Sequence, residues 1–204
     1  MMQSKKDEVK KDIEAAALQT FFEKGFVETK MSDIADAIGI SVGNIYTYFK
    51  NKKDLFYSVV PPILVDYLKK ILVETIHFDN QHFPVDADSE ARSSLFQAQI
   101  DLLATYNRQI IIIFEKNKGT SYVNAKNELV DLMVETKKAY LTPPSKHHEL
   151  NPDEHMAMLH IIAHHIIDMN LDLLKREMSA DSRRRIFQTL SVYQLNGMKS
   201  LYDS

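Results

Sequence analysis

Apolar residues recur at spacings of three and four along most of the chain, which is the period of an amphipathic helix. In residues 7–24 the repeating positions are Val9, Ile13, Ala16, Ala17 and Phe21. The same pattern predicts further helices at about 31–38, 42–48, 51–76, 90–104, 106–117, 121–141, 152–178 and 179–202. We therefore expect an all-α fold of about nine helices.

Turn and capping residues mark where these helices end. Gly25 and Gly39 each close an apolar run, as glycine does where a helix ends in a left-handed conformation. The string from Asn151 to Glu154 is a helix start, with asparagine as cap, proline in the first turn and glutamate reaching back. Pro61-Pro62 must kink or interrupt the helix at 51–76. Residues 78–89 and 142–150 are polar and rich in turn residues, so we predict loops there.

Composition excludes several classes of protein. The 204 residues contain no cysteine, which rules out disulfides and cysteine nucleophiles. No apolar stretch reaches the length of a signal peptide or of a membrane-spanning helix, so we expect a cytoplasmic protein with no membrane partner. The net charge is −3, and residues 1–57 hold as many lysines as acidic residues. Any contact with DNA must therefore come from local clusters such as Lys50, Lys52 and Lys53.

The segment from Gly25 to Lys52 has the pattern of a helix-turn-helix. Ala35 is small enough for two helices to cross closely, and Gly39 makes the tight turn between them. Ile40 and Ile45 fill the core beneath. Ser41 caps the second helix, whose N-terminal residues would enter a major groove.

The exposed face of that second helix has groups suited to DNA. Asn44 can hydrogen-bond a base edge, adenine being favoured by geometry, and Val42 can touch a thymine methyl group. The hydroxyls of Tyr46 and Tyr48 suit phosphate oxygens, and Lys52 lies in the first turn of the next helix, where it can hold a phosphate.

Residues 7–55 resemble the DNA-binding segment of the TetR/AcrR family of transcriptional regulators. The matching residues are Ile13, Ala16, Ala17, Phe21, Gly25, Phe26, Thr29, Ile34, Ala35, Gly39, Ile40, Ser41, Gly43, Ile45, Tyr46, Tyr48, Phe49, Lys52 and Leu55. The resemblance implies DNA contacts at Thr29, Ser41, Val42, Gly43, Asn44, Tyr46, Thr47, Tyr48 and Lys52. It also implies a DNA-binding domain at 7–67 and an effector-binding and dimerisation domain at 68–204. Lys30 departs from the family, which usually has a capping serine or threonine there, and so does Pro61-Pro62.

The last two predicted helices are candidates for a homodimer interface. Both are apolar on more than one side, and two such helices from each subunit would build a four-helix interface. Burial within one subunit is the alternative. The predicted interface residues are Leu159, Ile162, Ile166, Met169, Leu173, Phe187, Leu190, Gln194, Met198 and Leu201.

Aromatic, methionine and histidine residues of the C-terminal part are candidates for an effector pocket, because such pockets are mostly apolar with a few polar groups. They are Phe96, Tyr106, Phe114, Tyr122, Met133, Tyr140, Met156, His160 and His164. His160, His164 and Asp168 also share one helix face at a spacing that suits a metal ion, although a packed, hydrogen-bonded histidine pair is the commoner state.

These features favour a transcriptional regulator, and they leave two alternatives open. We expect a dimer that binds a near-palindromic operator and is released by a small hydrophobic or amphipathic effector, with no catalytic residue and no cofactor. The first alternative is a metal-dependent enzyme that uses His160, His164 and Asp168. The second is a helical adaptor that does not bind DNA.

Overall fold

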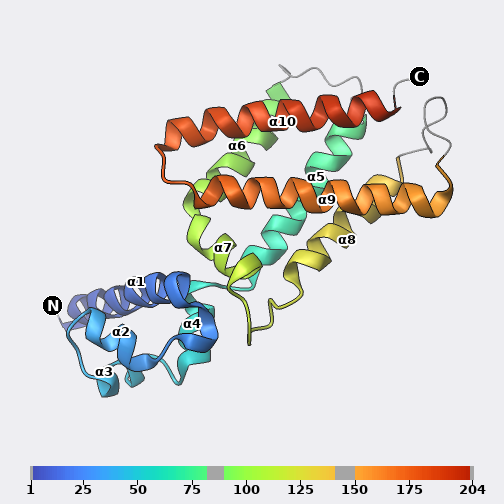
Figure 1. Ribbon diagram of the computed structural model, residues 1–204. Coiled ribbons are helices and arrows are strands. Elements are labelled where there is room, and N and C mark those ends of the chain that lie inside the picture. Colours follow the sequence, from blue (N-terminus) through green and yellow to red (C-terminus); the bar gives the residue numbers. More distant parts are fainter. Residues whose placement is uncertain (1, 82–89, 141–149, 203–204) are drawn as a thin grey trace. The chain divides into compact units, whose positions relative to one another are not determined.

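The computed structural model describes residues 2–81, 90–140 and 150–202. Within them it contains helices and no strand, so the all-α prediction is confirmed (Figure 1). The helices are α1 (Met2–Glu28), α2 (Met31–Ala37), α3 (Val42–Tyr46), α4 (Lys52–Val59), α5 (Ile63–Gln81), α6 (Glu90–Thr105), α7 (Asn107–Glu115), α8 (Ala125–Lys138), α9 (Pro152–Lys175) and α10 (Ala180–Tyr202).

The described residues hold ten helices where the pattern predicts about nine, because one predicted helix is broken in two. Pro61 and Pro62 have no backbone N–H to donate, so α4 ends at Val59 and α5 begins at Ile63. The amide of Leu64 donates to the Pro61 carbonyl at 3.0 Å, which restarts the helical hydrogen bonding. The proline pair thus interrupts the helix rather than bending it.

The predicted start of α9 is confirmed. The side-chain oxygen of Asn151 accepts from the amides of Asp153 and Glu154, each at 3.0 Å. Glu154 in turn accepts from the Asn151 amide at 2.8 Å, which completes a capping box. The predicted loops are only partly covered: residues 78–81 belong to α5, while 82–89 and 141–149 lie outside the described residues.

The chain forms two compact units. The first contains residues up to Tyr67 together with Tyr106–Lys126, and the second contains Leu68–Thr105 and the residues from Asn127 onward. The sequence placed a boundary after residue 67 but assigned everything beyond it to a single domain. Residues 106–126 instead pack with the first unit, and the assignment of functions to the two predicted domains remains a prediction.

The core of the first unit joins α1, α4 and α7. Phe21 of α1 and Phe56 of α4 are fully buried, with ring centroids 5.1 Å apart in an edge-to-face arrangement. The run Ile110–Phe114 of α7, whose β-branched residues are unusual in a helix, is buried throughout. This run lies in a helix, as predicted, because apolar packing outweighs its modest helix propensity.

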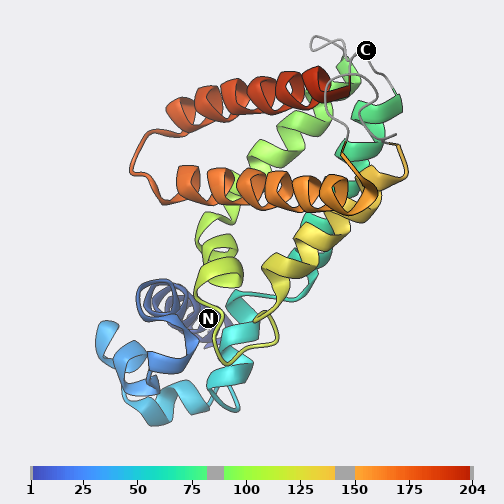
Figure 2. The same ribbon diagram turned by 45° about the vertical axis from the view of Figure 1, so that its right-hand side comes forward.

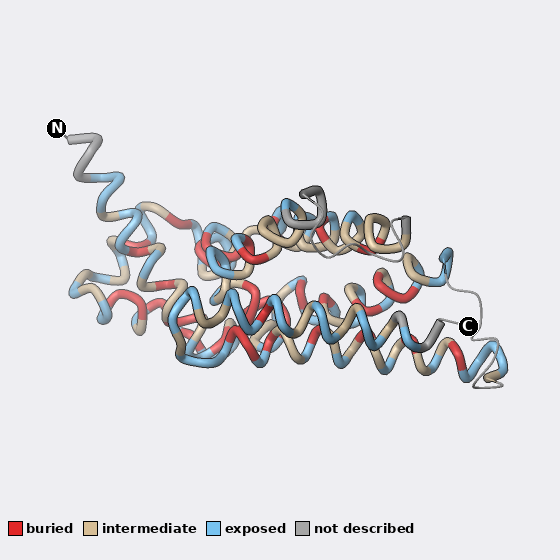
Figure 3. Tube along the Cα trace, turned by 90° about the horizontal axis from the view of Figure 1, so that it is seen from above, coloured by how far each residue is buried: buried red, intermediate tan, exposed pale blue. Residues whose placement is uncertain are grey.

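The second unit contains most of α5 and α8 and all of α6, α9 and α10. In α9 the buried positions include Leu159, Ala163, Ile167 and Leu171, spaced four apart. The long helices accordingly alternate between buried and exposed positions (Figure 3). Helices α9 and α10 lie side by side and run in opposite directions (Figures 1 and 2). Within the described residues, no helix combines the length and apolar character needed to span a bilayer.

Candidate nucleic-acid interface

The turn between α2 and α3 has the geometry that the glycine pattern predicts. Gly39 has φ = 67°, a left-handed value that glycine adopts without a Cβ clash. The amide of Ile40 donates to the Ala35 carbonyl at 3.1 Å, and that of Gly39 donates to Asp36 at 3.3 Å. These bonds close the end of α2 and fix the direction in which the chain enters α3.

The short helix α3 buries one side and exposes the other. Ser41 caps it by accepting from the Asn44 amide at 3.2 Å, and Ile45 is fully buried beneath. Gly43 and Thr47 are exposed, and Tyr46 is 51% exposed. The face predicted to meet DNA is therefore open within the described residues.

Thr29 does not fit the predicted contact set. Its side chain is only 1% exposed, and its hydroxyl donates to the Gly25 carbonyl at 2.7 Å. The hydroxyl thus closes the kink at the end of α1, where Gly25 has φ = 77°. We correct the sequence expectation: Thr29 has a structural role, and its side chain is not available to a ligand.

The phosphate contact predicted for Lys52 is also corrected by the structure. Its ammonium group donates to the carbonyls of Phe26 and Thr29, each at 2.8 Å, and to that of Val27 at 3.3 Å. It also lies 4.6 Å from the centroid of the Phe26 ring. An ammonium group has three donors, and all three are engaged here. Lys52 therefore ties α4 to the end of α1 and has no donor left for a phosphate.

The cap of α2 replaces the usual serine or threonine with a different group. Lys30 cannot accept a hydrogen bond through its side chain, but its amide donates to the Asp33 carboxylate at 3.0 Å. That bond, together with Lys24 at 3.1 Å, holds the pKa of Asp33 below its ordinary value. The departure at Lys30 is thus compensated within the same turn.

A turn after α7, comprising residues 116–122, is bonded to α1 and to the end of α4, and it was not anticipated from the sequence. Lys116 donates to the Glu23 carbonyl of α1 at 2.9 Å, and the hydroxyl of Tyr122 donates to the Val60 carbonyl at 2.6 Å. Burial raises the pKa of Tyr122. Gly119, at φ = 80°, sits so close to Val27 that an added Cβ would lie 2.9 Å from a valine methyl group. These bonds fix the α4–α5 break and the end of α1.

The residues predicted to line an effector pocket do not gather in one unit. Tyr106, Phe114 and Tyr122 belong to the first unit, and the other six belong to the second. Within the first unit Tyr122 is buried and its hydroxyl is engaged, as described above. Within the second unit Tyr140 pairs with His77, and His160 lies 3.9 Å from the Asp131 carboxylate. The second unit also contains the other predicted pocket residues, Phe96, Met133, Met156 and His164.

The predicted dimer residues divide into two groups. Leu159, Leu173 and Phe187 are buried within their own chain, so they do not form a free surface, and we correct their assignment. Ile162, Ile166, Met169, Leu190, Gln194 and Met198 are partly exposed, and the side chain of Leu201 lies outside the described part. Beside them the structure shows an unpredicted stripe on α10, with Ile186 40% and Tyr193 62% exposed.

The histidine cluster does not form a metal site. Among the described side chains, no group of three or more histidine, aspartate or glutamate residues is arranged to hold a metal ion. The alternative of a metal-dependent enzyme at His160, His164 and Asp168 therefore has no support in the geometry.

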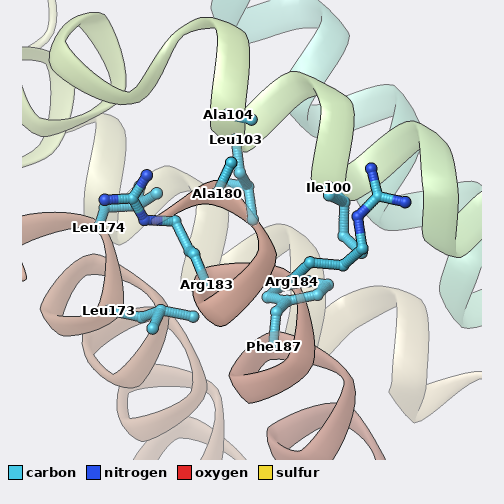
Figure 4. Close-up of a pocket in the computed structure, with 9 residues that line it drawn as sticks. All are labelled: Ile100, Leu103, Ala104, Leu173, Leu174, Ala180, Arg183, Arg184 and Phe187. Atoms are coloured by element: carbon cyan, nitrogen blue, oxygen red, sulfur yellow. The ribbon is translucent and has the colours of Figure 1, made fainter. Parts of the chain in front are cut away.

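The second unit contains a small hollow between α6, α9 and α10 (Figure 4). It measures about 320 Å³ with its open mouth included, and the centre of a water-sized sphere can occupy about 20 Å³ of it, which is room for about one water molecule. Its lining consists of Ile100, Leu103, Ala104, Leu173, Leu174, Ala180, Arg183, Arg184 and Phe187. Among these are none of the predicted pocket residues, because three separate helices contribute and no local pattern connects them.

The first unit thus defines the chain as an all-α protein with an open helix-turn-helix near its N-terminus. Residues 13–59 match the profile of the family described as "Bacterial regulatory proteins, tetR family". The chain is 26% identical over 134 residues to the HTH-type transcriptional repressor BepR of Brucella suis biovar 1, a match that covers 66% of this chain and 61% of BepR. It is 42% identical over 55 residues to the HTH-type transcriptional regulator RutR of Escherichia coli strain K12, covering 27% of this chain and 26% of RutR.

The fold also has a counterpart among solved structures. A TetR-like transcriptional regulator from Rhodococcus sp. RHA1 superimposes with a TM-score of 0.50 at 16% identity, covering 92% of this chain and 95% of that one. The similarity to the tetR family of bacterial regulatory proteins thus lies in residues 13–59, which contain the helix-turn-helix. The match to BepR spans about three-fifths of the length of BepR.

Proposed function

We propose that this protein binds duplex DNA through α3 and represses transcription. The observation that carries the proposal is the open outer face of α3, with Tyr46 half exposed above a fully buried Ile45, in the segment that matches the family. The exposed side chain of Tyr46 carries a hydroxyl group, and tyrosine hydroxyls can bond the phosphate oxygens of DNA. The name of BepR as a repressor supports the sign of regulation.

Lysines other than Lys52 supply the charge in this proposal. Lys6 lies 5.9 Å from the ring centroid of Tyr48, which brings a cation from α1 beside the end of α3. Lys50 and Lys53 are exposed at the start of α4. Contacts to phosphate position a protein on DNA, while Asn44 and Val42, which are half-buried at the start of α3, read base edges. This assignment keeps Ser41, Gly43 and Thr47 as neighbours of the DNA and removes Thr29 and Lys52.

The protein acts as a homodimer in this proposal. The stripe on α10 consists of Ile186 and Tyr193, which are exposed, and Leu190, which also packs partly against the core of its own unit. Their spacing of four and three places them on one face of the helix. Covering such a stripe with its copy would bury apolar area that a monomer leaves in water. A dimer carries two copies of α3, which would read two half-sites of a near-palindromic operator. A small hydrophobic or amphipathic effector would release the operator by binding one of two conformations more tightly.

Selection of duplexes from a random pool by the purified full-length chain tests the proposal. We expect the selected sequences to share two inverted half-sites whose centres are about one helical turn apart, or a small multiple of it. Replacing Tyr46 with alanine should weaken binding to the selected duplex about tenfold or more, since one good contact is worth that much. Replacing Lys50 with glutamine should lower the slope of log K against log salt by about 0.9.

The control is Lys138 of α8, an exposed lysine of the second unit that pairs with Glu135 at 3.7 Å. Its replacement by glutamine should leave both affinity and salt dependence unchanged. Selection that enriches no sequence, or binding that is indifferent to Tyr46, would favour the helical adaptor without DNA binding. Enrichment of single half-sites would contradict the dimer.

A further inference from the structure

The hollow between α6, α9 and α10 combines an apolar lining with cationic side chains at its edge. Ile100 of α6, Leu173 of α9 and Phe187 of α10 form one buried cluster there. Two arginines of α10 flank it: Figure 4 shows the guanidinium group of Arg183 beside Leu174 and the side chain of Arg184 beside Ile100. An apolar hollow whose edge carries positive charge is complementary to a molecule with an apolar tail and an anionic head.

Arg183 is the less satisfied of the two arginines. Its Nε is buried and has no hydrogen-bond partner, although its Nη2 donates to the Arg176 carbonyl at 3.1 Å. No carboxylate of the described residues pairs with it. Buried polar atoms are almost always bonded, so an unsatisfied one in a cationic group points to a missing acceptor. The acceptor that matches a guanidinium group best is a carboxylate.

Arg184 is already engaged and plays a secondary part. Its Nη1 donates to the Gln97 side chain at 2.9 Å, and its Nη2 lies 3.9 Å from the Asp101 carboxylate. The side chain is 45% exposed, so this pair is weak and screened by water. Arg184 therefore adds positive charge at the mouth without competing for the position that Arg183 leaves open.

We propose that this hollow binds a small amphipathic carboxylate, with the head on Arg183 and the tail among Ile100, Leu103 and Phe187. As described, the hollow has room for about one water molecule, so the tail enters by moving α10 away from α6. That movement is feasible because Phe187 is the single buried residue of α10 among those whose burial is described. The inference deepens the effector part of the proposed function and rests on it only for the regulatory consequence.

Calorimetric titration of the full-length protein without DNA tests the site, with four probes that separate head from tail. Decanoate has an anionic head and an apolar tail, and acetate has only the head. Decanol has the tail without a charge, and decylammonium has the tail with a positive charge. We expect decanoate to bind, and acetate, decanol and decylammonium to bind at least tenfold more weakly, since the head and the tail each contribute. Equal binding of decanoate and decanol would overturn the proposal.

Variants locate the binding. Arg183→Gln should weaken decanoate binding about tenfold or more, because a charged hydrogen bond is lost. Ala104→Phe should weaken it as well by covering the mouth, and since Ala104 is exposed the substitution does not disturb the core. The matched control is Arg185→Gln on the same helix turn, whose arginine does not line the hollow and donates to Ser182 at 3.3 Å.

The outcomes are decisive in both directions. Loss of binding in Arg183→Gln and Ala104→Phe with retention in Arg185→Gln supports the site. Unchanged binding in the first two variants, or an equal loss in all three, places decanoate elsewhere or shows general attraction to positive charge. Because no DNA is present, failure of this titration leaves the selection experiment untouched, and failure of the selection leaves this titration valid.

Discussion

Replacing Lys52 with methionine tests whether this lysine stabilises the fold or binds a phosphate of DNA. Methionine keeps the length and apolar character of the stem but removes three donors, two of which bond carbonyls at 2.8 Å. Hydrogen bonds to charged groups contribute about 1.5–3 kcal/mol each. Because Lys52 is partly exposed, water can replace part of this loss, and we expect unfolding free energy to fall by about 2–3 kcal/mol. For a chain of this size that lowers Tm by about 4–12 °C.

Thermal and urea unfolding followed by circular dichroism measure this effect. The control is Lys53→Met, since Lys53 is exposed and its ammonium group lies 6.0 Å from the centroid of the Tyr57 ring; the unfolding free energy of this variant should change by no more than about 0.5 kcal/mol. At a temperature where Lys52→Met is folded, the salt dependence of its DNA binding should equal that of the unchanged protein. An unchanged Tm combined with a flatter salt dependence would refute the reasoning, because it would show Lys52 on a phosphate.

Two further substitutions test the turn at residues 116–122. Gly119→Ala should destabilise the protein by about 2 kcal/mol in urea unfolding, because alanine at φ = 80° is strained and its Cβ would lie 2.9 Å from Val27. Tyr122→Phe should cost about 1–3 kcal/mol at neutral pH, since the buried Val60 carbonyl loses its donor. The pKa of Tyr122 is raised in the folded state, so its contribution is complete below the ordinary tyrosine pKa of about 10 and declines above it. The difference in unfolding free energy between the Tyr122→Phe variant and the unchanged protein should therefore become smaller above about pH 10.

Matched controls exist for both. Gly197 lies within α10 with open space around it, so Gly197→Ala should stabilise by up to about 1 kcal/mol, opposite in sign to Gly119→Ala. Tyr106 is exposed, and Tyr106→Phe should have little effect at neutral pH. Two results would contradict the roles assigned to this turn. One is a Gly119→Ala variant as stable as the unchanged protein. The other is a difference in unfolding free energy between Tyr122→Phe and the unchanged protein that stays constant at alkaline pH.

Local features were predictable because their causes are local. The capping box at Asn151, the glycine turn at Gly39 and the break at Pro61-Pro62 each depend on residues within one or two helical turns. The helical state of Ile110–Phe114 was also predictable, since no partner strand was available. Periodicity is sufficient wherever neighbouring residues alone decide the structure.

The errors share a different physical origin. Lys52 bonds carbonyls 23 to 26 positions earlier in the chain, and no spacing rule reaches that far. Thr29 looks exposed by its polarity, yet the kink at Gly25 places its hydroxyl over a carbonyl. The hollow beside Arg183 is assembled from three helices, and its cationic edge resembles ordinary surface charge in the sequence. Long-range packing decides each of these cases, and a pattern of apolar positions does not encode which helices meet.

The packing of residues 106–126 with the N-terminal unit limits how this protein can be dissected. A fragment that stops at residue 67 would lack four consecutive buried isoleucines, Ile110–Ile113, and the ammonium group that meets Glu23. The surface of α1 that they cover would then face water, so the fragment would be prone to aggregate. Expressing the first unit by itself therefore requires both of its stretches of chain, joined by a designed connection.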